Sequence, residues 1–236
     1  MSFLTDLPRE RTLIDASLWS ADLGALTAEV ERIGSYADLF HIDASDTSFT
    51  PDAIFFPDLV RALRPKTAVP FHVHLMAHRP AHLASAFADA GADLITVHAE
   101  AEDAQAALER IHAGGQAAGL ALTLDRDPAQ VEDLIELADA VTMVGTPLGT
   151  KGTGMAPEAV DRMRAVRQIL DRRGTDIPLL ADGGIRQHTV PDLVAAGATG
   201  VVAGSLLFGS ADPAATAEWI RSQHPAATAL AEEGFR

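Results

Sequence analysis

Eight short apolar segments recur along the chain, and a segment with helical periodicity follows each of them. Apolar runs of about four to eight residues are typical of buried strands, whereas apolar residues three and four positions apart are typical of helices that pack on a sheet. We expect strands at residues 12–18, 39–44, 70–76, 94–99, 120–124, 140–145, 178–182 and 200–204, and helices at residues 22–33, 57–63, 80–90, 101–113, 129–137, 157–173, 188–195 and 213–222.

This alternation predicts an α/β fold, the (β/α)8 TIM barrel, in which parallel strands close into a barrel inside a ring of helices. The structural alternative is an open, doubly wound sheet, which usually has a glycine-rich turn after its first strand. Residues 17–20 read SLWS and contain no glycine, which favours the barrel. No linker or low-complexity segment divides the 236 residues, so we expect residues 1–236 to form a single barrel domain.

The chain is strongly acidic, with 33 Asp and Glu against 18 Lys and Arg and a formal net charge of −15. The negative electrostatic field of such a chain repels nucleic acid and anionic membranes, so we expect neither as a partner. Backbone N–H groups can still bind a small phosphate locally. The absence of cysteine excludes a cysteine nucleophile and leaves His, Asp and Glu as metal ligands. Residues 1–11 lack a signal-peptide pattern, so we expect a cytoplasmic location.

Polar residues stand at the carboxyl ends of several predicted strands, where a barrel places its active site. His41 and Asp43 are two positions apart and therefore share a face of their strand. His74 and Asp182 end two other strands. A single histidine here is more often a buried core residue, but four such groups at one barrel mouth favour a divalent metal ion such as zinc, iron, manganese or cobalt.

Glycines follow the last two predicted strands, at Gly183 and Gly184 and at Gly204, which Ser205 follows. Barrels often bind phosphate with the loops after strands 7 and 8, because glycine lets a phosphate approach the backbone closely. Each glycine alone is also compatible with an ordinary turn. Together, at these two places, they indicate a phosphate site.

Ordered motifs along nearly the whole chain resemble the ribulose-phosphate 3-epimerase family. The similar segments are residues 16–22 (ASLWSAD, family PSILSAD), 41–51 (HIDASDTSFTP, family HVDVMDGHFVP), 73–76 (VHLM), 90–93 (AGAD), 96–100 (TVHAE), 181–185 (ADGGI, family VDGGI) and 202–205 (VAGS), with the family's Phe at position 208.

The resemblance implies a barrel of the ribulose-phosphate-binding type and a homo-oligomeric isomerase of pentose phosphate metabolism. It implies one divalent metal ion, held by His41, Asp43, His74 and Asp182, that stabilises an enediolate as a Lewis acid. The two aspartates would be the catalytic acid and base at C3 of a ketose phosphate, D-ribulose 5-phosphate or a close analogue, one on each face. The expected substrate contacts outside the loop after strand 6 are Ser17, His74, Met76, Met143, Gly183, Gly184, Gly204 and Ser205.

The chain departs from the family pattern beside the expected metal and in the loop after strand 6. Ser45 and Thr47 replace a Met and a Gly of the family. Residues 146–154 read TPLGTKGTG where the family has NPGFGGQ. We include Gly149, Lys151 and Gly152 among the expected substrate contacts; Lys151 is compatible with a phosphate or carboxylate contact and with a solvated loop charge. His72 and His98 are expected to support the site without binding the metal.

Three other functions are compatible with parts of this pattern. Lyases of the orotidine-phosphate decarboxylase and hexulose-phosphate synthase group use a D-x-K-x-x-D motif, but residues 43–46 read DASD and lack the Lys. A non-catalytic sugar-phosphate binder would not need both Asp43 and Asp182. The departures beside the expected metal and in residues 146–154 are equally compatible with two kinds of epimerase. One acts on D-ribulose 5-phosphate, and the other acts on a different ketose phosphate or on a phosphorylated sugar acid.

Overall fold

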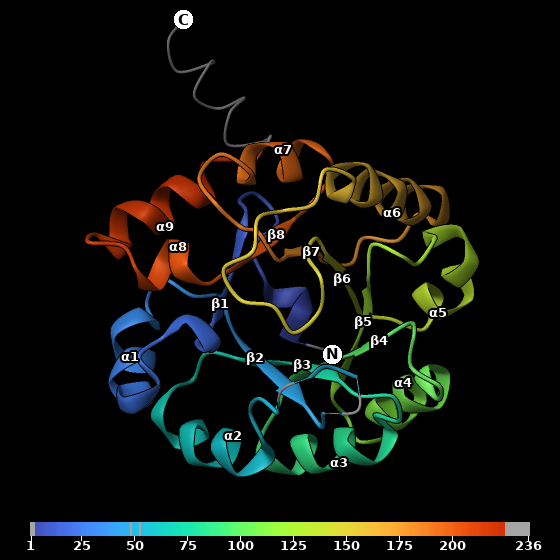
Figure 1. The fold of residues 1–236 in the computed structure, drawn as a ribbon, viewed down its shortest axis with the longest axis horizontal. Coiled ribbons are helices and arrows are strands. Elements are labelled where there is room, and N and C mark those ends of the chain that lie inside the picture. The colour runs from blue at the N-terminus through green and yellow to red at the C-terminus, as the bar shows by residue number, and fades with distance from the viewer. Residues whose placement is uncertain (1–2, 48, 52, 225–236) are drawn as a thin grey trace, which may run out of the picture.

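Eight parallel strands close into a barrel in the order of the sequence, and β8 pairs with β1 to complete it (Figure 1). The computed structural model describes residues 3–47, 49–51 and 53–224; Ser48 of the family-like motif lies outside them. The predicted (β/α)8 barrel is confirmed. The strands are β1 (Leu13–Ser17), β2 (Leu39–Ser45), β3 (Phe71–Met76), β4 (Leu94–His98), β5 (Ala117–Leu122), β6 (Ala140–Val144), β7 (Leu179–Asp182) and β8 (Gly200–Ala203).

Helices form a ring outside the strands (Figure 1). Local sequence sets several of their ends: the Asp212 carboxylate accepts a hydrogen bond from the N–H of Ala215 at the start of α9, and Gly174, with a φ of 63°, ends α6. The α-helices are α1 (Leu26–Ile33), α2 (Pro57–Leu63), α3 (Ala81–Ala90), α4 (Ala104–Ala113), α5 (Glu132–Glu136), α6 (Ala159–Arg173), α7 (Val190–Ala195), α8 (Ser205–Phe208) and α9 (Pro213–Arg221), and the 3-10 helices are η1 (Phe3–Asp6), η2 (Leu18–Ser20), η3 (Leu23–Ala25), η4 (Arg64–Lys66) and η5 (Pro128–Val131).

The fifth strand begins at Ala117, three positions before the predicted start at residue 120. Alanine and glycine are weak strand formers, so the local sequence gives little strand signal there. Pairing with β4 supplies what the local sequence lacks, since Ala117 lies opposite Leu94 and Gly119 opposite Thr96. A Cβ on Gly119 would lie 1.9 Å from Thr96 Oγ1, so only glycine allows this close approach.

Apolar side chains fill the space between strands and helices and close the lower end of the barrel. The lower end is sealed by Leu4 of η1, which packs against the first residues of β2, β4, β5 and β6. Above this seal the barrel interior is polar, with Asp15, His41, His72 and Thr96 all fully buried. Buried polar groups need hydrogen-bond partners, so this layer must form a connected network.

The connection between β6 and α6 crosses in front of the barrel mouth, drawn in yellow in Figure 1. This connection contains residues 146–154, the segment in which the sequence departs most from the family pattern. Its position makes it a wall of whatever site the barrel mouth contains. Within the described part of the chain, no helix combines the length and the apolar character that a membrane crossing requires.

Candidate active site

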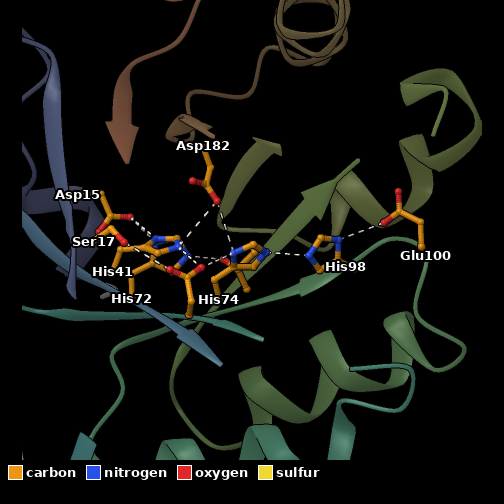
Figure 2. Close-up of polar contacts among 10 residues, drawn as sticks. Asp15, Ser17, His41, His72, His74, His98, Glu100 and Asp182 are labelled. Carbon is orange, nitrogen blue, oxygen red and sulfur yellow. Dashed lines mark hydrogen bonds and ion pairs between the residues drawn. The ribbon is translucent and has the colours of Figure 1, made fainter. Parts of the chain in front are cut away.

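Four polar side chains from three strands meet at the carboxyl end of the barrel (Figure 2). His41 and Asp43 come from β2, His74 from β3 and Asp182 from β7. Asp43 Oδ1 lies 3.3 Å from both His41 Nε2 and His74 Nδ1. Asp182 Oδ2 lies 3.9 Å from His41 Nε2 and 3.5 Å from His74 Nδ1. One donor atom from each residue lies within 4.8 Å of the others, so the four predicted ligands form one cluster.

This donor set fits a divalent metal ion, because imidazole nitrogen and carboxylate oxygen are common ligands of zinc, iron, manganese and cobalt. The orientation of the His41 ring also fits a metal site. Its Nδ1 lies 3.0 Å from Asp15 Oδ2, and a carboxylate only accepts, so Nδ1 donates its proton there. The other nitrogen, Nε2, therefore faces Asp43 and Asp182 and is available to a metal.

Charge also favours a cation among these groups. Burial raises the pKa of Asp182, and the negative charge of Asp43 adds to the rise. Burial acts in the same direction on Asp43, but His41 and His74 outweigh it and hold the pKa of Asp43 well below its usual range. Burial alone would lower the pKa of His41, yet Asp43 and Asp15 raise it well above its usual value. A bound metal ion would replace the proton that His41 Nε2 otherwise carries.

A second buried network lies directly below the cluster. The Nδ1 of His72 donates to Asp15 Oδ2 over 2.6 Å, and its Nε2 accepts from the Thr96 hydroxyl over 2.7 Å. Burial would raise the pKa of Asp15, but His72 and His41 outweigh it and lower it to about 2. Asp15 is therefore an ionised anchor for both histidines. Asp15 was not predicted from the sequence, although its spacing of two from Ser17 places both on the inward face of β1.

His74 is linked to a different carboxylate on the other side of the cluster (Figure 2). Its Nε2 lies 2.7 Å from Nε2 of His98, and Nδ1 of His98 lies 3.3 Å from Glu100 Oε2. Glu100 Oε1 accepts from both the backbone N–H and the hydroxyl of Thr123. Burial would raise the pKa of Glu100, but these hydrogen bonds outweigh it and lower it to about 2.

Burial also lowers the pKa of His98, from the usual 6.5 to about 4, and this predicts a pH-dependent stability. Between these pH values the unfolded chain binds a proton at His98 that the folded chain does not. The free energy of unfolding of the metal-free protein should therefore fall as the pH drops from 6.5 to 4, by roughly 3 kcal/mol in total from His98. Urea unfolding of the wild type and of His98→Phe across this pH range tests the prediction. If the free energy of unfolding falls equally with pH in both proteins, the low pKa of His98 is not its cause.

A cavity of about 180 Å³ opens over the cluster at the barrel mouth. Asp43, His74 and Asp182 line it, whereas His41 is fully buried beneath it. Ser17 Oγ lies 3.4 Å from Asp43 Oδ2, at the edge of the cluster. The predicted substrate contacts that line the cavity are Ser17, His74, Met76, Gly149, Lys151, Gly152, Gly183, Gly184, Gly204 and Ser205.

The structure corrects the predicted position of Met143. Its side chain packs in the core between strands and helices, and its neighbour Val144 lines the cavity instead. The reason is strand alternation: Val144 pairs with the inward-pointing Asp182, so Met143 faces outward. Arg186, which follows the glycine pair after β7, also lines the cavity and was not predicted from the sequence. No motif around Arg186 indicates that its side chain points into the cavity.

Backbone geometry explains the glycine pair after β7. Gly183 and Gly184 have φ values of 83° and 68°, a region that favours glycine. A Cβ on Gly184 would also lie 2.4 Å from the backbone nitrogen of Met155, on the loop that leads into α6. The pair therefore lets the β7 loop and the β6 loop approach each other beside the cavity.

Lys151 extends from the β6 loop across the cavity toward the end of β1. Its Nζ donates to the carbonyl oxygen of Trp19 over 2.5 Å and lies 5.9 Å from the centre of the indole ring. Lys151 and Arg186 are the cationic side chains that line the cavity, in a chain with a net charge of −15. Lys151 thus lines the cavity, although its side chain is exposed to solvent.

Comparison with known proteins agrees with this geometry. The model of the ribulose-phosphate 3 epimerase family matches residues 13–208, a span that holds the barrel and the whole cluster. The chain belongs to this family. Like the other members of the epimerase family, it is an enzyme of the isomerase class.

Named relatives match over most of their length. The chain is 34% identical over 199 residues to a ribulose-phosphate 3-epimerase of Bacillus subtilis, covering 83% of this chain and 92% of the relative. It is 33% identical over 217 residues to one of Mycobacterium bovis, covering 92% and 94%. It is 31% identical over 214 residues to one of Escherichia coli, covering 89% and 95%.

Solved structures with a similar fold include a decarboxylase and a synthase. A 3-keto-L-gulonate-6-phosphate decarboxylase of Vibrio cholerae has a TM-score of 0.67 at 20% identity, covering 90% of this chain and 97% of that chain. A 3-hexulose-6-phosphate synthase of Salmonella typhimurium has the same TM-score and identity, covering 90% and 98%. At such identities the likeness shows only that the barrel fold is shared. It does not change the assignment of the chain to the epimerase family.

Proposed function

We propose that this protein is a metal-dependent 3-epimerase of a ketose phosphate, with D-ribulose 5-phosphate and D-xylulose 5-phosphate as the first substrates to test. The observation that carries the proposal is the cluster of Asp43, Asp182, His41 and His74 beneath an open cavity. The names of the relatives support the choice of substrate.

The cluster residues would hold one divalent ion, zinc, iron, manganese or cobalt, which supplies Lewis-acid stabilisation of negative charge that develops on substrate oxygens. The protein supplies the carboxylates. Asp43 comes from β2 and Asp182 from β7, with β1 and β8 between them, so their carboxylates approach the cavity from different directions. One removes the C3 proton and the other returns a proton on the opposite face, which inverts the configuration at C3.

The loops after β7 and β8 would bind the phosphate. Gly183, Gly184, Gly204 and Ser205 line one region of the cavity, and glycine leaves backbone N–H groups open to a phosphate oxygen. The predicted substrate contact of Ser17 fits this placement, since Ser17 lines the same cavity as these residues and its hydroxyl lies 3.4 Å from Asp43 Oδ2. A phosphate held there would place the ketose carbons toward the cluster.

Proton NMR in D2O tests the reaction directly. Metal-loaded protein is mixed with D-ribulose 5-phosphate and other ketose phosphates, with metal-stripped protein as the control. We expect deuterium to enter at C3 only when metal is present, together with formation of the C3 epimer. Cleavage of a carbon–carbon bond of the substrate would instead show a lyase. Unchanged spectra with every substrate would mean either a substrate outside the panel or a binding protein.

We further propose that Lys151 contacts the substrate's anionic group. Replacing Lys151 with Met should raise KM for the phosphorylated substrate by about 10-fold or more, because a charge-assisted hydrogen bond contributes about 1.5–3 kcal/mol. Lys66→Met is the matched control, since Lys66 is the chain's other lysine and lies in η4, outside the cavity. Equal KM values in both variants would make Lys151 a loop residue without a substrate contact.

We also expect a cytoplasmic location, and we expect a homo-oligomer because the family resemblance implies one. Light scattering of the purified chain measures its oligomeric state.

A further inference from the structure

The His74–His98–Glu100 chain has no part in the mechanism described so far, yet it ends on a predicted metal ligand (Figure 2). His98 is fully buried, and its ring lies 5.0 Å, between centroids, from Phe49 of the β2–α2 loop. Its two ring nitrogens both have polar partners. These partners fix the tautomer of the buried ring as well as its position, because each partner constrains which nitrogen carries the proton.

The hydrogen-bond donors and acceptors leave one consistent arrangement. Glu100 Oε1 is occupied by two donors from Thr123, and Oε2 can only accept from His98. Nδ1 of His98 must therefore carry its proton, which leaves Nε2 of His98 as an acceptor. The partner at 2.7 Å, Nε2 of His74, is then the donor. Nδ1 of His74 remains as the nitrogen that faces Asp43 and Asp182.

We propose that Glu100 is a positioning residue that acts through His98 to keep the proton of His74 on Nε2 and its Nδ1 directed at the metal. The inference rests on the proposed metal site. In this arrangement a carboxylate orients each of the two predicted histidine ligands. Asp15 contacts His41 directly, and Glu100 acts on His74 through His98. Such supporting carboxylates orient ligands and raise their basicity.

Glu100→Gln tests the direction of this chain without changing its size. The N–H of Thr123 requires an oxygen at the position of Oε1, so the new amide must turn its NH2 group toward His98. Nδ1 of His98 then has to accept, the proton moves to Nε2 of His98, and Nε2 of His74 becomes the acceptor. Glu102→Gln is the matched control, because this exposed residue lies two positions further along the same loop.

Two readouts follow. Nitrogen-15 NMR of metal-free, histidine-labelled protein should show the His98 proton on Nδ1 in the wild type and Glu102→Gln, but on Nε2 in Glu100→Gln. Titration with Zn²⁺ alone should show affinity about 10- to 100-fold weaker in Glu100→Gln only. Glu100→Asp, which restores an acceptor, should recover part of the affinity.

The same experiments separate the inference from the proposed function. If Glu100→Gln keeps both the wild-type proton position and the wild-type Zn²⁺ affinity, the positioning role is wrong even when the enzyme epimerises. If wild-type protein binds no Zn²⁺ while the NMR shift of the proton occurs, the metal site is wrong and the chain of hydrogen bonds stands. Should Glu100→Gln unfold, His98→Phe removes the acceptor for His74 instead; wild-type Zn²⁺ affinity in that variant would overturn the proposal.

Discussion

Replacing Asp182 with Asn is expected to lower kcat for epimerisation by about 10²- to 10⁴-fold, the contribution typical of a general acid or base. The amide keeps the size of the side chain and an oxygen that can face the cluster, but it cannot take up or return a proton. Stopped assays with D-ribulose 5-phosphate give kcat, and metal content measured on the same samples separates loss of proton transfer from loss of the ion.

A finer expectation distinguishes two bases from one. With Asp43 intact, one face of C3 still has a base, so Asp182→Asn should exchange the C3 proton of one epimer with D2O without converting it to the other. Asp43→Asn should show the opposite preference. Asp192→Asn, on the exposed face of α7, is the control and should behave as the wild type. Full epimerisation by Asp182→Asn would exclude the paired-carboxylate mechanism.

Removing a histidine ligand is expected to have a comparably large effect through the metal. His41→Ala and His74→Ala each delete one of the donor nitrogens, and we expect Zn²⁺ affinity to fall by at least about 100-fold, since loss of supporting residues alone costs about 10- to 100-fold. Chelator treatment of the wild type should likewise abolish epimerisation, and added metal should restore it. Elemental analysis and isothermal titration measure occupancy and affinity.

His112→Ala provides the control for histidine removal. His112 is exposed on α4 and pairs with Asp139, away from the barrel mouth. This variant should bind metal and turn over as the wild type does. A His74→Ala variant with wild-type metal content would show that the ion is held elsewhere.

The sequence by itself predicted the fold and the four residues of the proposed metal site. The fold prediction depends on a repeating local pattern. Eight alternations of apolar and helical segments favour a barrel, which the structure confirms, and period two along β2 places His41 and Asp43 on one face. The ends of the predicted strands singled out His74 and Asp182, and the family-like motifs assigned all four residues to one metal site; the structure brings the four into one cluster.

Other features depended on contacts between segments far apart in the chain. The alanine- and glycine-rich start of β5 becomes a strand only through pairing with β4, where a missing Cβ at Gly119 makes room for Thr96. The face of Met143 followed from the register of β6 on β7, which sequence similarity did not reveal.

The supporting carboxylates were decided in the same way. Asp15 and Glu100 are ordinary acidic residues in the sequence, and 26 positions separate Asp15 from His41. Pairing of β1 with β2 brings Asp15 against His41, and pairing of β3 with β4 brings His98 against His74, in an interior where an unpartnered charge would be costly. Tertiary structure therefore decided the hydrogen-bond partners of the four cluster residues, while the sequence had already predicted the cluster residues themselves.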